Sequence, residues 1–151
     1  MYVLLLTLHS WFRWAVLAGL LLALGRAGRG WLGQRPFRPL DNTLRHSAAT
    51  LAQVQLMLGY ALYFSSPLVA SFRQSARLAT SDARFFGLLH VLLMTLAVVV
   101  LTIGSALAKR RATDAARFRT MTLWFAAALL IMLAAIPWPF SPLANRPLFR
   151  F

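Results

Sequence analysis

The sequence predicts an all-α integral membrane protein, a bundle of four transmembrane helices that run alternately up and down. The first observation is composition, since the 151 residues are 60% hydrophobic and 13% charged. The second is four long apolar runs, each near the ~20 residues that a helix needs to cross a bilayer. The third is that short connections, which favour antiparallel neighbours, join these runs. The runs cover 3–25, 48–66, 85–108 and 121–137, and they form one transmembrane domain over residues 1–151.

The first run has the properties of a retained helix rather than a signal peptide. No basic segment precedes it, it is too long, and no small-residue cleavage site precedes Arg26. The chain also lacks cysteine, which excludes disulfides, thiolate metal sites and covalently attached c-type haem.

Polar and turn-forming residues mark where the later helices begin and end. Side chains with an acceptor oxygen cap helix N-termini, and proline cannot continue a helix. We therefore predict caps in the Asp-Asn pair at 41–42 and the Thr-Asp pair at 113–114. The Ser-Ser-Pro sequence at 65–67 closes the second helix, and Pro-Trp-Pro-Phe at 137–140 ends the last.

The distribution of charge predicts the orientation in the membrane. Sixteen Lys and Arg against three Asp and Glu give a net charge of +13, and the basic residues concentrate beside apolar helices. Anionic lipid head groups are therefore the expected partners, not nucleic acid. The positive-inside rule places the first and third connections in the cytoplasm and both termini outside, N-out and C-out. The first connection carries Arg26, Arg29, Arg35, Arg38 and Arg45, and the third carries Lys109, Arg110, Arg111, Arg117 and Arg119.

Two histidines lie inside the predicted spans, where ionisable groups are costly and usually functional. His9 lies ~10 Å inside the outer end of the first helix at 1.5 Å per residue. His90 lies at a similar depth in the third helix, which enters from the same face. In an up-down bundle these helices are parallel across a diagonal, with axes ~12–14 Å apart. That gap suits two imidazoles with an iron atom between them.

The histidine pair therefore predicts a haem b in the outer leaflet, with His9 and His90 as its axial ligands. Gly59 on the second helix reaches the same level and would leave room for the flat macrocycle, while Arg84 suits a propionate. Two histidine ligands leave no open iron position, which is typical of electron transfer. The alternative is that both histidines form hydrogen bonds that only hold helices together. No paired carboxylates exist for acid–base catalysis, so no catalytic residue is assigned.

Arg13 is the other charged residue of the first span, one turn from His9 on the same face. Because the spans contain no Asp or Glu, its charge needs a carbonyl, a propionate, a lipid or quinone head group, or another chain. We expect Arg13 in the bundle interior or at a partner interface rather than facing lipid. Gln53 and Gln55 are expected to form hydrogen bonds across helices, and His46 to be solvated.

Several segments together resemble a known family: LHSWFRW at the start, QLMLGYALYFSSP, RFFGLLHVLLM, TIGSALAKRRATD and the final AIPWPFSPLANRPLFRF. Nearly the whole chain is similar to small four-helix bacterial membrane proteins, common in Bacteroidetes-type genomes and often labelled cytochrome b. The resemblance implies a bacterial inner membrane protein and gives weight to His9, Arg13, Gly59 and His90. The family pattern often has histidine where this chain has Gln53, so a ligand role is lost there.

Two functions remain open at this level. The first is a b-type cytochrome that transfers electrons with quinol or a larger redox complex. The alternative is a cofactor-free accessory subunit that stabilises a respiratory or photosynthetic membrane complex. Either function implies other membrane subunits or a homo-oligomer as partners. A small transporter or channel is less favoured because the spans lack acids and broken helices.

Overall fold

The computed structural model describes residues 1–149, and these residues form helices without any strand. A π-helical turn, Phe85–Leu89, joins two of the helices into one continuous segment. The helices are α1 Tyr2–Leu32, α2 Pro39–Ser65, α3 Pro67–Gln74, α4 Ser81–Arg84, α5 His90–Arg110 and α6 Asp114–Ala135. The all-α prediction is confirmed.

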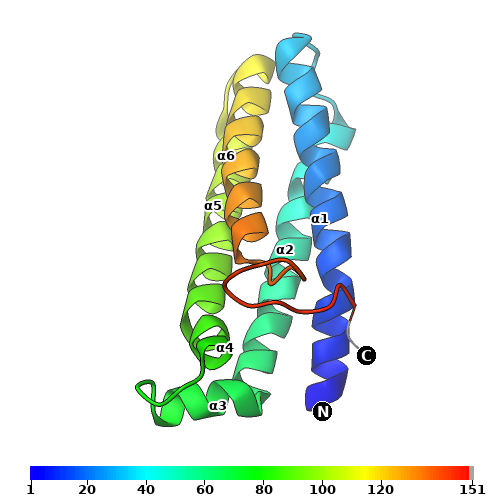
Figure 1. The fold of residues 1–151 in the computed structure, drawn as a ribbon. Coiled ribbons are helices and arrows are strands. Elements are labelled where there is room, and N and C mark those ends of the chain that lie inside the picture. Colours follow the sequence, from blue (N-terminus) through cyan, green and yellow to red (C-terminus); the bar gives the residue numbers. More distant parts are fainter. Residues whose placement is uncertain (150–151) are drawn as a thin grey trace.

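The long helices α1, α2, α5 and α6 lie side by side (Figure 1). Helix α1 packs against α2 and α6, and α5 packs against the same two helices, so α1 and α5 face each other across a diagonal. The N-terminus and α3 lie at one end, which we call the terminal end. The connections 33–38 and 111–113 lie at the opposite end, which we call the connection end.

Three helical segments among the described residues are long and apolar enough to cross a membrane. They are Tyr2–Leu32, Ser81–Arg110 and Asp114–Ala135, and they support the prediction of a membrane protein. Helix α2 is outside this set because polar side chains interrupt its sequence, from Asp41 and Arg45 to the glutamines further along. The prediction of four spanning helices is therefore supported for three.

The helices are longer at the connection end than their apolar runs predicted. Helix α1 continues to Leu32, and α2 begins at Pro39, because arginine stems lie along a helix while their charges reach water. Asp41 is consequently inside the first turn of α2, where it accepts a hydrogen bond from the Arg38 backbone N–H at 2.7 Å. The predicted cap at 113 is confirmed, since the Thr113 hydroxyl accepts from the Ala116 N–H at 3.3 Å.

One face of α5 forms part of the apolar core. Its small residues Ala97, Gly104 and Ala108 are buried. A Cβ atom on Gly104 would lie 2.2 Å from the Cβ atom of Trp124, so glycine is required where α5 meets α6. Close approach over small residues is the usual way in which membrane helices pack.

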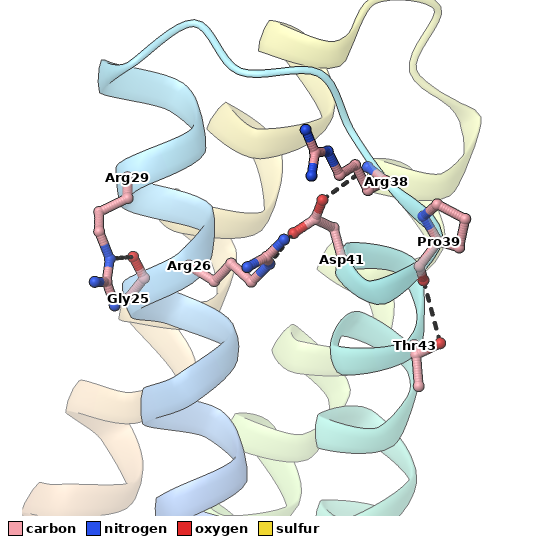
Figure 2. A network of polar contacts seen from close by, with 7 residues as sticks. All are labelled: Gly25, Arg26, Arg29, Arg38, Pro39, Asp41 and Thr43. Carbon is pink, nitrogen blue, oxygen red and sulfur yellow. Dashed lines mark hydrogen bonds and ion pairs between the residues drawn. The ribbon is translucent and has the colours of Figure 1, made fainter.

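Buried polar groups at the connection end are paired. Asp41, which is 2% exposed, forms an ion pair with Arg26 of α1 (Figure 2). Arg45 is 5% exposed and donates to the carbonyl and hydroxyl oxygens of Ser105 at 2.9 and 2.5 Å. Its other donors reach the Asn42 side chain at 2.8 and 3.2 Å. These bonds connect α2 to α1 and to α5.

Candidate functional site

The His9–His90 region surrounds a mostly apolar cavity of about 170 Å³. Helices α1, α2, α5 and α6 all contribute to its walls. The segment 136–149, which follows α6, crosses in front of α2 and α1 and adds a further wall (Figure 1). Because few polar groups line this space, those that do are the ones able to give it chemical specificity.

The two predicted histidines meet across the cavity. His9 lies on α1, and His90 is the first residue of α5. Their ring centres are 6.4 Å apart, and the ring planes are inclined at 71°. The sequence predicted that the two histidines lie at a similar depth, and their contact agrees with this. The prediction works because α1 and α5 run in the same direction across the diagonal.

His90 is oriented by the end of another helix. Its Nδ1 lies 2.8 Å from the carbonyl oxygen of Ala135, the last residue of α6. A helix leaves its final carbonyls without partners, and a carbonyl can only accept. The Nδ1 atom must therefore carry the proton, and the neutral ring keeps the Nε2 lone pair as an acceptor or metal ligand.

The π-helical turn Phe85–Leu89 leads directly into His90. Such turns insert one residue into a helix and often occur at functional sites. Its carbonyl at Gly87 accepts from the Tyr63 hydroxyl at 3.2 Å, and a Cβ on Gly87 would lie 2.3 Å from the Phe72 ring. These contacts hold the turn against α2 and α3.

His9 is set by α2 in a way that differs from the prediction for Gly59. A Cβ atom on Gly59 would lie 3.2 Å from His9 Cε1, so the glycine makes room for the imidazole itself rather than for a macrocycle. The carbonyl of His9 accepts from the Gln55 side chain at 2.8 Å. The buried Nδ1 atom of His9 has no hydrogen-bond partner among residues 1–149.

Arg13 lines the cavity, as expected for an interior position. One guanidinium nitrogen donates to the carbonyl of Leu148, and the group lies 5.2 Å from the centre of the Trp14 ring. Phe149 packs against Trp11 and Trp14, with ring centres 4.7 and 5.7 Å apart. A carbonyl of this chain thus supplies part of the compensation for which the sequence had suggested an external partner.

Arg84 lies away from the cavity. It is exposed, and its guanidinium donates to the carbonyls of Ala79 at 3.1 Å and Arg77 at 3.4 Å. The cavity is instead lined by Arg146, which sequence reasoning missed. The signal that could have indicated it is an arginine between prolines and aromatic residues in the final segment, a composition suited to packing.

Arg146 connects the final segment to the start of α4. It forms an ion pair with Asp82 at 2.5 Å, and its guanidinium lies 5.1 Å from the centre of the Phe86 ring. Phe86 belongs to the π-helical turn that precedes His90. The last segment is therefore tied to both sides of the site, through Arg13 on α1 and through Asp82.

The predicted roles of the glutamines are confirmed. Gln53 donates to the Thr102 hydroxyl at 3.1 Å, which joins α2 to α5, and Gln55 joins α2 to α1. His46 is exposed, as predicted. Within residues 1–149 no three His, Cys, Asp or Glu side chains are grouped to hold a metal.

Comparison with known proteins does not assign the chain. No family model matches it, and no curated protein or solved structure matches it significantly. The resemblance to small four-helix membrane proteins therefore rests on its sequence motifs and stays a prediction.

Proposed function

We propose that this protein is a b-type cytochrome of the membrane, an electron carrier in which His9 and His90 hold the iron of a haem b. The observation that carries the proposal is the 6.4 Å between the two ring centres, across the bundle diagonal. In a bis-histidine site each iron–nitrogen bond is ~2 Å, and the centre of each imidazole lies about 1 Å beyond its nitrogen. The two ring centres are therefore expected to be about 6 Å apart.

The surroundings of the His90 ring also suit this ligand set. Metal-binding histidines usually donate their second ring nitrogen to a carbonyl or carboxylate, which fixes the tautomer. The Ala135 carbonyl does this for His90 and leaves Nε2 available. The Nδ1 atom of His9, which lies beside Gly59, has no such partner within residues 1–149. A bis-histidine haem, when bound, supplies one-electron transfer and leaves no position for oxygen.

We further propose that α1, α2, α5 and α6 all cross the bacterial inner membrane, with both termini outside. Support comes from the basic connections 33–38 and 111–113, which share one end of the molecule. The polar side chains of α2 form hydrogen bonds to neighbouring helices, which lowers the cost of placing this helix in lipid. A reporter fused after Phe151 should be active only outside the cytoplasm.

The test is a reduced-minus-oxidised optical spectrum of the full chain purified in detergent, as isolated and after titration with haem b. Wild-type protein should show b-type bands, and His9→Ala and His90→Ala should each lose them. His46→Ala is the matched control, because this exposed histidine lies outside the cavity, and it should keep them. Absence of bands from wild-type protein under both conditions would overturn the proposal and favour the accessory-subunit alternative.

A further inference from the structure

We propose that Arg13 and Arg146 form a carboxylate-binding subsite in the same cavity, which therefore takes an apolar molecule that carries an acid group. The inference deepens the proposed function and rests on it for one source of the group, the propionates of haem b. A fatty acid presents the same carboxylate on an apolar body without iron. The residues that would bind the carboxylate are thus two that line the cavity, whereas the sequence had suggested Arg84.

The first observation is where unpaired polar atoms gather. Buried polar atoms in native proteins nearly always have partners, and each one left unpaired lowers stability. Among residues 1–149, every residue with such a side-chain atom lines the cavity, except Trp14. The atoms in question are His9 Nδ1, Ser10 Oγ, Arg13 Nε, Gln55 Oε1 and Arg146 Nε. This concentration indicates a place for the polar groups of a ligand.

The second observation is the sign of the charge. Both guanidinium groups line a mostly apolar space, and within the described residues no Asp or Glu lines it. Asp82 neutralises one of the two charges through a single nitrogen of Arg146, from a position 37% exposed. Among residues 1–149, Arg13 is compensated by the Leu148 carbonyl and by the Trp14 ring. One net positive charge remains for an acidic ligand.

The third observation is the geometry that guanidinium groups offer. Each carries five donors in a planar fork that fits a carboxylate, and it stays charged in any protein environment. Arg13 and Arg146 each have an unpartnered Nε atom in addition to the nitrogen already bonded. The Arg13 guanidinium donates to Leu148, which lies two residues after Arg146, so both arginines are tied to the same final segment.

The test compares two ligands that differ only in their acid groups. The full chain in detergent is titrated with haem b and with its dimethyl ester, and affinity is read from the absorbance change on binding. Charge-assisted hydrogen bonds contribute about 1.5–3 kcal/mol, so wild type should prefer the free acid by roughly tenfold or more. Arg146→Gln and Arg13→Gln should lose this preference, whereas Arg84→Gln, an exposed arginine outside the cavity, should retain it.

Equal affinity of wild type for both ligands would overturn the subsite while leaving the histidine ligands intact. Retention of the preference by Arg146→Gln would overturn it equally, even if Arg13→Gln failed to fold. If wild type gives no bis-histidine spectrum with either ligand, the proposed function fails on its own. The same variants are then titrated with a fluorescent fatty acid and its methyl ester. Selective binding of the acid that Arg146→Gln abolishes would support the subsite, and equal binding would overturn it.

Discussion

The two ends of the bundle differ in whether their buried polar groups have hydrogen-bond partners. At the connection end, Asp41 and Arg45 are almost fully buried, and each has partners on a neighbouring helix. Around the cavity, His9, Arg13 and Arg146 retain buried nitrogen atoms that have no hydrogen-bond partner in the described part of the chain. A satisfied network specifies how helices pack, whereas an unsatisfied one costs stability unless a ligand completes it. This difference supports the proposal that one end of the bundle is structural and the other binds a ligand.

Packing at the connection end should be the most sensitive to change. Gly104→Ala places a methyl group 2.2 Å from the Cβ atom of Trp124, and neither backbone can yield. We expect a loss of about 3 kcal/mol in unfolding free energy, measured by denaturant titration in detergent. Gly28→Ala is the control, because a Cβ there meets nothing within 4 Å, and it should not destabilise the protein. Equal stability of the two variants would contradict the close packing of α5 and α6.

Removal of the buried arginine should affect folding and leave ligand binding unchanged. Arg45→Leu deprives Ser105 and Asn42 of their partner, with an expected cost of about 2 kcal/mol. Arg29→Leu removes an exposed arginine bonded only within its own helix and should cost much less. Thermal unfolding measures the cost, and a haem titration of each variant checks the cavity. A weakened haem affinity in Arg45→Leu would show that the two ends are not independent.

A small change at the cavity should have the opposite effect, with little loss of stability and a weaker haem affinity. Gly59→Ala places a methyl group 3.2 Å from His9 Cε1, so the imidazole must move by a few tenths of an ångström. We expect a change below about 1 kcal/mol in stability, together with a severalfold weaker haem affinity. Gly19→Ala makes a similar 3.1 Å approach to a flexible leucine side chain, Leu51, and should leave haem affinity unaltered. Identical haem affinities for the two variants would argue against the role assigned to His9.

The sequence alone determined the features that depend on regular helices. Helix rise is constant, so counting residues from each helix end placed His9 and His90 at the same depth before any contact was known. Helix limits were less predictable, because arginine stems allow α1 and α2 to extend beyond their apolar runs.

Only the tertiary structure decided which groups complete the site. The Ala135 carbonyl orients His90, Asp82 positions Arg146, and Gly59 receives the His9 ring rather than a macrocycle. Each of these contacts joins segments that are far apart in the chain. Neither the periodicity nor the composition of the sequence indicates that the two residues of such a pair are in contact. Their partners are set by how the four long helices pack and by the path of segment 136–149 across them, which local sequence does not specify.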